Sequence, residues 1–152
     1  MSAPDSPPIV TPSSDHNCFG CGPANDCGLK LRFQQDGAGV TALYIPRSQD
    51  EGFFGIVHGG IVTTMLDEAM AWATYAGGVW AMTARLEVRF RKPVIVGSGL
   101  TVHGRIAQVR GKVVETAGEV RDADGVILAE ATATFIRVPA DTAAEWERRY
   151  FG

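Results

Sequence analysis

The segment VHGGIVTTMLDEAMAWATYAGGVWAMTA, residues Val57–Ala84, constrains the fold more than any other part of this chain. It predicts a long helix that breaks at Gly77 and Gly78, and it contains one His, two acids, Asp67 and Glu68, and no Lys or Arg. A helix on the surface of a globular protein carries a solvated, charged face. Because this helix lacks such a face, other parts of the protein must cover most of its surface.

Six further segments predict β-strands. Two precede the helix, at about 29–34 and 40–46, joined by the turn DGAG, and four follow it, at 82–94, 100–110, 112–122 and 126–138. Tight turns between successive strands indicate antiparallel pairing. We therefore expect an α+β fold, in which a single antiparallel sheet of about six strands wraps around one long central helix.

Two details of this arrangement bear on function. Alternation in 82–94 places Leu86 and Val88 on one face of the strand and Thr83 on the other. A single sheet layer cannot cover a helix on all sides, so part of the helix should face a partner subunit, and we expect a dimer.

The rest of the chain predicts one domain. A Pro- and Ser-rich segment, 1–15, is expected to be flexible, the domain to span 16–140, and 141–152 to hold a short amphipathic helix. Hydrophobic residues make up 45% and charged residues 20%, a globular balance, and the net charge of -3 gives no basic field for nucleic acid or anionic membranes. The start of the chain has no apolar signal core, and three Cys fit no disulfide framework, so we expect a cytoplasmic protein.

The central helix carries a pattern that suggests chemistry. On a helical wheel Asp67 lies opposite the core face, which holds Ile61, Val62, Met65, Leu66, Ala69, Trp72 and Ala73, and it lies beside the small residues Thr63, Ala71 and Thr74. The glycines at the helix start expose unpaired backbone amides that could stabilise a carbonyl oxygen gaining negative charge. Asp67 could then activate a water or attack the carbonyl. The plainer alternatives are a solvated acid and a tight loop.

These residues coincide with a family pattern. HGGIVTTMLDEA, followed by AGGVWAMTARLEVRFRKPV and preceded by CFGCGPANDCGL, resembles the hotdog-fold acyl-CoA thioesterases of the PaaI and hydroxybenzoyl-CoA thioesterase type, over about 17–138. The resemblance implies the wrapped-helix fold, a homodimer or a tetrameric dimer of dimers, and sites across the subunit interface. It implies hydrolysis of acyl-CoA to free acid and CoA, with no cofactor beyond the coenzyme A of the substrate.

By position, the resemblance assigns four catalytic residues. Asp67 would be the general base or nucleophile, and Gly60 would offer its amide to the thioester carbonyl. His58 would orient that loop or bond the substrate. Thr83, from the neighbouring subunit, would hold the attacking water or the acid.

Substrate contacts are expected from Gly59, Glu68, Phe54, Arg91 and Lys92. Glu68 is an alternative acid, since some hotdog thioesterases use Glu. Phe54 and its neighbour could line the acyl pocket or belong to the core. Arg91 and Lys92 could bind the phosphates of coenzyme A, or simply form a solvated strand end.

The cysteine-rich loop allows a further interpretation. His16, Cys18, Cys21 and Cys27 could hold zinc, but a second Cys-x-x-Cys is missing and the family lead-in is not usually a metal site. We therefore expect no metal, and a loop folded over the sheet edge.

Two questions stay open at this point. A non-catalytic module that binds acyl-CoA is the main alternative to a hydrolase, and a hydratase is a weaker one. The acyl group is not determined, because Trp72, Tyr75, Trp80 and the two phenylalanines at 53 and 54 would suit an aromatic or an aliphatic chain.

Overall fold

The fold was described from a computed structural model, which covers residues 8–152. In chain order its elements are β1 (Gln34–Asp36), β2 (Gly39–Tyr44), the 3-10 helix η1 (Ser48–Asp50), α1 (Gly59–Ala76), β3 (Ala81–Phe90), β4 (Leu100–Arg110), β5 (Val113–Arg121), β6 (Ile127–Arg137) and α2 (Ala140–Phe151). The four strands expected after the helix are therefore confirmed, as is a helix near the C-terminus.

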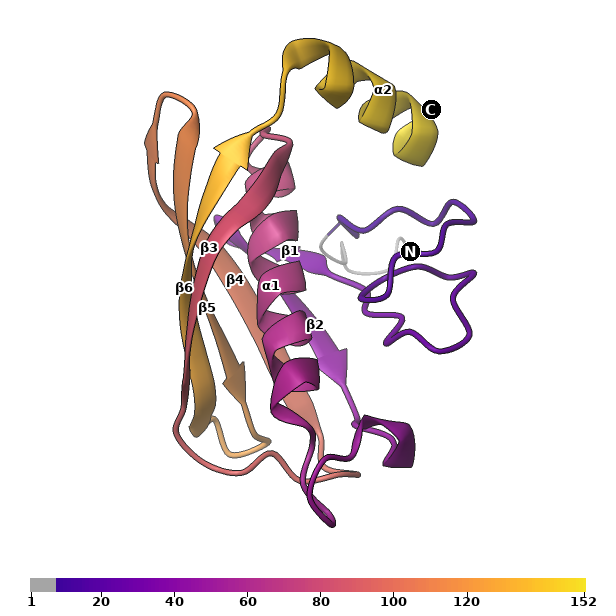
Figure 1. Ribbon diagram of the computed structural model, residues 1–152, viewed down its shortest axis with the longest axis vertical. Helices are drawn as coiled ribbons and strands as arrows, with labels where there is room; N and C mark the ends of the chain where they lie inside the picture. The colour runs from indigo at the N-terminus through magenta and orange to yellow at the C-terminus, as the bar shows by residue number, and fades with distance from the viewer. Residues whose placement is uncertain (1–7) are drawn as a thin grey trace, which may run out of the picture.

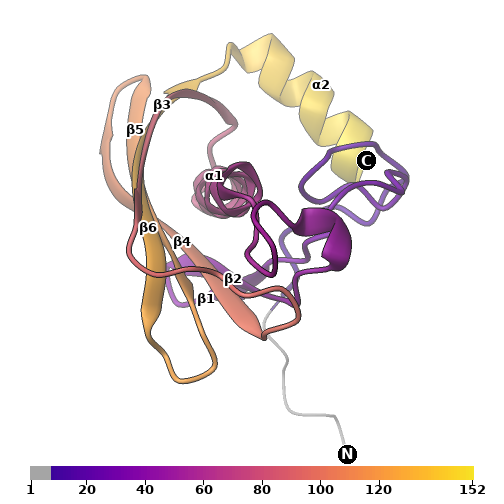
Figure 2. The same cartoon turned by 60° about the horizontal axis from the view of Figure 1, so that its bottom comes forward.

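The six strands form one antiparallel sheet in the order β1-β2-β4-β5-β6-β3. The sheet curves, and α1 lies along its concave side (Figure 1). Seen closer to end-on, α1 lies within the curve of the sheet (Figure 2). The expected hotdog architecture, one sheet wrapped around a central helix, is confirmed.

The core lies between α1 and the sheet. The buried side chains of α1 are Val62, Met65, Leu66, Ala69, Met70, Trp72, Ala73 and Thr74. This set matches the expected core face closely, with two differences. Ile61 is only half-buried, and Thr74, which was expected on the open side beside Asp67, is buried. Gly104 of β4 permits close contact between β4 and α1, since a Cβ there would lie 2.2 Å from the carbonyl oxygen of Ala69.

Within residues 8–152, no helix is long and apolar enough to span a membrane.

The first strand differs from its prediction. It was expected over 29–34 but covers Gln34–Asp36 only. The preceding residues hydrogen-bond to a loop and not to the sheet: the Leu29 and Leu31 amides donate to the carbonyls of Phe19 and Gly20. Their side chains are nevertheless buried. The apolar alternation that predicts a strand here thus reflects burial beneath a loop.

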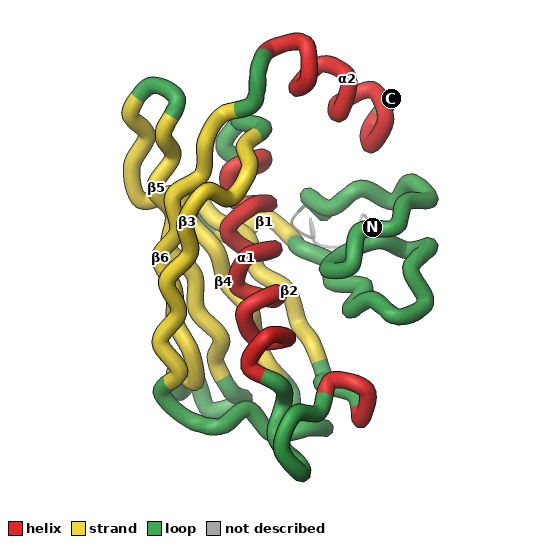
Figure 3. The backbone as a smooth tube through the Cα atoms, viewed as in Figure 1, coloured by secondary structure: helices red, strands yellow, loops and turns green. Residues whose placement is uncertain are grey.

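The chain ends pack around the far side of α1. The prediction of a flexible segment at 1–15 falls partly on residues 1–7, which lie outside the described residues. Beyond them, Ile9 bridges to Gln34, and Val10 and Thr11 are buried. The loop that follows lies on the side of α1 away from β5 and β6 (Figure 3). At its edge, the ring of His16 meets that of Tyr150 in α2 edge-on, with centroids 5.2 Å apart.

Candidate active site

The structure brings Asp67 and Thr83 together. The Thr83 hydroxyl donates to Asp67 Oδ1 over 2.6 Å, from β3 to the middle of α1. Asp67 is half-buried and Thr83 is exposed, so the pair opens toward solvent in the single chain. From the family resemblance, Thr83 was expected to reach the site from a neighbouring subunit. In the structure, Thr83 and Asp67 of the same chain are hydrogen-bonded. Two of the predicted catalytic residues therefore form one unit.

A β-bulge explains how Thr83 reaches α1. Strict alternation would place Thr83 on the opposite face from Leu86, but the pairing of β3 with β6 shifts register between Thr83 and Arg85. The extra residue reverses the alternation, so that Thr83 faces α1 on the same side as Leu86, which packs against the core. This part of the sequence-based assignment was wrong, because the bulge has no clear sequence signal.

The start of α1 is capped by a histidine. His58 is the N-cap residue, and its Nδ1 accepts the Gly60 amide over 2.8 Å. Nδ1 serves as the acceptor in this contact, so Nε2 is the ring nitrogen left for other partners. The residue pattern suggested only the glycines as caps, so this hydrogen bond was missed, although the family resemblance had His58 orient the loop.

This cap changes which amide is available. Gly60, the residue expected to bind a carbonyl oxygen, already donates its amide to His58. Gly59 is the first helical residue, where an amide has no intrahelical acceptor. Within residues 8–152 no acceptor is found for it. His58, Gly59 and Gly60 are all exposed. The geometry therefore makes the Gly59 amide the free donor at the helix start.

The helix start and Asp67 are far apart within one chain. Gly59 and Asp67 are eight residues apart on α1, which corresponds to about 12 Å along the helix axis. A donor to a carbonyl oxygen lies within roughly 3 Å of that oxygen. A general base reaches its proton directly or through one water. One small carbonyl group cannot meet both requirements within a single chain.

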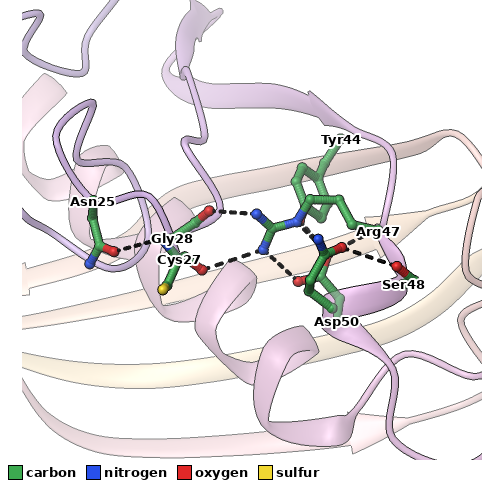
Figure 4. Close-up of polar contacts among 8 residues, drawn as sticks. Asn25, Cys27, Gly28, Tyr44, Arg47, Ser48 and Asp50 are labelled. Carbon is green, nitrogen blue, oxygen red and sulfur yellow. Dashed lines mark hydrogen bonds and ion pairs between the residues drawn. The ribbon is translucent and has the colours of Figure 1, made fainter.

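An ion pair between the buried Asp50 and the half-buried Arg47 holds the loop that leads into α1. Asp50, with 1% of its surface exposed, accepts the Arg47 backbone amide and the Arg47 Nη2, each over 2.8 Å, and the Tyr44 hydroxyl (Figure 4). Arg47 also donates to the Gly28 carbonyl over 3.0 Å. The Asp50 carbonyl accepts the His58 amide over 2.8 Å. The cluster thus connects β2, the N-terminal loop and the cap of α1.

Burial alone would raise the pKa of the Asp50 carboxyl, but the hydrogen bonds from Arg47 and Tyr44 outweigh it and hold that pKa below its usual range. Asp50 is therefore ionised at neutral pH and pairs with Arg47. This structural role of Asp50 was not predicted from the sequence, because the cluster also includes Gly28 and His58, which approach it only in the folded chain.

Apolar side chains surround the helix start. Phe54 is 96% exposed and Phe53 is 87% exposed, so neither belongs to the core of the single chain. Phe90, at the end of β3, lies beside Gly59: a Cβ built on Gly59 would be 3.5 Å from its ring. Exposed aromatic rings in a group favour contact with a ligand or a partner.

The candidates for phosphate binding are not equivalent. The Arg91 guanidinium pairs with Glu130 over 2.7 Å. Lys92 is exposed and forms no ion pair within residues 8–152. Lys92 is thus the more available cation of the two at this strand end.

Glu68 does not join Asp67 and Thr83. It lies on the flank of α1, where its carboxylate accepts the Cys18 thiol over 3.1 Å and the Trp72 indole N–H over 3.0 Å. Burial raises the pKa of Glu68 to about 8. An acid in these surroundings does not suit the role of a base exposed to substrate, and Asp67 stays the better candidate.

The aromatic residues at the far end of α1 have partners of their own. The ring of Tyr75 stacks on Phe151 of α2, with centroids 4.8 Å apart. Glu147 accepts the Tyr75 hydroxyl over 3.2 Å and the Trp80 indole N–H over 3.0 Å. Of the aromatic residues considered for the acyl group, the pair at 53 and 54 is therefore the more open to a ligand.

A family model described as the thioesterase superfamily matches residues 54–129. Among curated proteins, the acyl-coenzyme A thioesterase THEM4 of Xenopus laevis is 35% identical over 102 residues, which make up 65% of this chain and 45% of that protein. An uncharacterized protein of Schizosaccharomyces pombe is 28% identical over 109 residues, or 68% of this chain and 62% of that protein. The matched regions make up 45% and 62% of these two relatives, so the chain spans less than two thirds of their length.

Solved structures show the same fold. The crystal structure of a thioesterase superfamily protein has a TM-score of 0.76 at 28% identity, and the match covers 79% of this chain and 63% of that one. The PaaI protein from the phenylacetic acid degradation operon of Escherichia coli has a TM-score of 0.68 at 18% identity and 73% and 81% coverage. A Streptococcus mutans protein bound to acetyl CoA has a TM-score of 0.67 at 18% identity and 71% and 88% coverage.

Proposed function

This chain belongs to the thioesterase superfamily, and we propose on that basis that it hydrolyses acyl-CoA thioesters to a free acid and CoA. The observation that carries the proposal is the Asp67–Thr83 pair on a helix with few other charges. The activity printed for the Xenopus relative supports an acyl-CoA substrate. A carboxylate held by one hydroxyl and open to solvent has the geometry of a general base.

In the proposed reaction Asp67 takes a proton from a water, and the water oxygen attacks the thioester carbonyl carbon. Thr83 keeps the carboxylate in place. The Gly59 amide, at the positive end of the α1 dipole, stabilises the oxyanion that forms. When the tetrahedral intermediate collapses, the C–S bond breaks and the coenzyme A thiolate leaves with the electron pair. The thiolate then takes the proton held by Asp67, which returns to its carboxylate form. Direct attack by Asp67 through an acyl anhydride is the alternative route. Neither route needs a cofactor.

The experiment that tests this proposal is release of free thiol from a panel of aromatic and aliphatic acyl-CoAs by the purified protein. Turnover above that of buffer supports a hydrolase and ranks the acyl groups. Binding of the esters without release of thiol would favour the alternative, a non-catalytic acyl-CoA module.

The role given to the Gly59 amide can be tested by removing that amide alone. Pro is well tolerated at the first position of a helix, and the extended backbone of His58, φ -57° and ψ 134°, is compatible with a following Pro. Gly59→Pro is expected to lower kcat by roughly 10²–10³-fold, the cost of losing one oxyanion donor. Gly59→Ala keeps the amide and should retain most activity.

The matched control in this comparison is thermal unfolding of both variants. Equal melting temperatures would show that the helix start is intact in each. If the Pro and Ala variants have the same kcat, the oxyanion donor lies elsewhere.

We further propose that the active form is a homodimer, or a dimer of dimers, in which Asp67 of one protomer faces the helix start of another. The distance of about 12 Å along α1 between Gly59 and Asp67 supports this arrangement. So does the position of β3 at one edge of the sheet, because an unpaired edge strand favours pairing with another chain. The exposed rings of Phe53, Phe54 and Phe90 could then be covered.

A complementation experiment tests the shared site. Two inactive chains, Asp67→Asn and Gly59→Pro, would be co-expressed with different affinity tags. If each site combines the two chains, half of the dimers are mixed and each mixed dimer has one intact site, so about a quarter of wild-type activity should return. A site contained in one chain would give no recovery. Sedimentation should show a mass of two or four times 16.2 kDa.

A further inference from the structure

The loop before β1 brings two cysteines onto the flank of α1. Cys18 Sγ, Cys21 Sγ and a carboxylate oxygen of Glu68 all lie within 4.8 Å of one another. One of these distances, between Cys18 Sγ and Glu68 Oε1, is 3.1 Å. Cys21 is buried, and the other two residues are half-buried. Three donor atoms of this kind at these separations match part of a tetrahedral zinc site.

The backbone of the loop fixes this convergence. The Gly22 amide donates to the Cys18 carbonyl over 2.7 Å and closes a tight turn around the two cysteines. Gly20 rests directly on Glu68, since a Cβ at this position would lie 2.1 Å from Glu68 Cγ. Only glycine fits there without moving the loop. The backbone of the loop therefore places the two cysteines beside Glu68.

The charge balance of the cluster lacks a cation. The Glu68 carboxylate receives hydrogen bonds from a thiol and an indole, both neutral. Glu68 takes part in none of the ion pairs formed within residues 8–152. Removal from water without a cation favours the protonated form of Glu68. A divalent ion would compensate the carboxylate and the two thiolates together.

The surrounding hydrogen bonds suit a metal ligand. The Trp72 indole N–H donates to Glu68 Oε2 over 3.0 Å, which leaves Oε1 directed at the cysteines. Carboxylates that bind metals are usually oriented by such an outer hydrogen bond.

We propose that Cys18, Cys21 and Glu68 bind one thiophilic divalent cation, of the Zn²⁺ class, with a water in the fourth position. Binding releases the protons held by the thiols and by the Glu68 carboxyl, and no electron is transferred. The ion fastens the N-terminal loop to α1. This inference is independent of the proposed hydrolase activity, and it differs from the expectation of no metal.

The donor set also differs from the one considered in the sequence. Cys27 is exposed and lies outside the cluster. His16 lies outside it too, although its Nδ1 accepts the Cys18 amide over 3.4 Å. Glu68, which is distant in sequence, takes their place.

The test uses the purified full chain after reduction, with mass spectrometry showing three free thiols. Zn²⁺ affinity is measured by competition with a chromogenic chelator, and Co²⁺ is titrated to observe the absorption of thiolate-to-cobalt charge transfer. We expect one ion per chain and a charge-transfer band. Cys18→Ser, Cys21→Ser and Glu68→Gln should each weaken binding by more than 100-fold, and Trp72→Phe by roughly 10–100-fold. Cys27→Ser should bind as the wild type does.

Three results would overturn the proposal. The first is a reduced wild-type protein that binds neither ion, a result that needs no variant and so does not depend on variant folding. The second is Glu68→Gln binding Zn²⁺ as tightly as the wild type. The third is oxidation of Cys18 and Cys21 to a disulfide, with loss of two hydrogens by mass, when the reduced protein is exposed to air with excess Zn²⁺ present.

Discussion

Replacing Asp67 with Asn is expected to lower kcat for thiol release by roughly 10²–10⁴-fold, the usual contribution of a general base. The amide has the shape of the carboxylate and can still accept the Thr83 hydroxyl, which lies 2.6 Å from Asp67 Oδ1. It cannot take a proton from water. Binding of the ester should change little, so KM is expected to stay within a few-fold of the wild-type value.

Steady-state thiol release, measured with the acyl-CoA that the wild type hydrolyses fastest, checks this result. Asp26→Asn makes the same chemical change at a side chain that is 99% exposed and serves as the matched control. Wild-type turnover in Asp67→Asn would show that this carboxylate is not the base. If Glu68→Gln were inactive at the same time, the base would be the neighbouring acid.

Replacing Asp50 with Asn is expected to lower the free energy of unfolding by about 2–3 kcal/mol, less than for a fully buried ion pair, because the Arg47 side chain is 33% exposed to solvent. The loss should be large because Asp50 is 1% exposed and accepts hydrogen bonds from both Tyr44 and Arg47. The Arg47 guanidinium would lose its counter-ion. Urea unfolding at neutral pH, followed by circular dichroism, measures the change, again with Asp26→Asn as the control. A loss of less than 1 kcal/mol would contradict the role given to this pair.

The same carboxylate predicts a pH dependence. The pKa of Asp50 is lower in the folded protein than its ordinary value, so its ionised form stabilises the fold at neutral pH. That contribution is lost as the pH falls below the ordinary value of about 3.9 and then through the lower folded-state pKa. The free energy of unfolding of the wild type should therefore decrease more steeply in acid than that of Asp50→Asn. Parallel pH profiles would show that the pKa shift is not coupled to folding.

The general fold could be predicted from the sequence because the patterns that indicate it extend over many residues. The scarcity of charge over 57–84 indicates a covered helix whatever the details of packing. The long strands β4, β5 and β6 alternate regularly and are joined by short turns. These patterns involve many residues each, so one irregularity does not change the outcome.

The site was less predictable because it depends on single residues. One extra residue in β3 turns Thr83 toward α1. At the N-cap, the His58 imidazole accepts the Gly60 amide, so the free amide is that of Gly59 and not that of Gly60. Glu68 looked like a second candidate acid until a loop from about fifty residues away was seen to contact it. Tertiary contacts of this kind leave no periodic pattern in the sequence.

The bulge in β3 limits which changes of length the chain can tolerate. Regular pairing of the same residues, without the bulge, would turn Thr83 away from Asp67. Deleting Ala84 would remove the bulge but leave Thr83 paired with Phe135 and on the same face as Leu86. An insertion in the turn between β4 and β5 would leave the pair untouched. Homologues that keep this Asp–Thr pair should therefore vary in length at such turns. Between the strand threonine and the residue equivalent to Leu86 they should have two residues with the bulge or one residue without it.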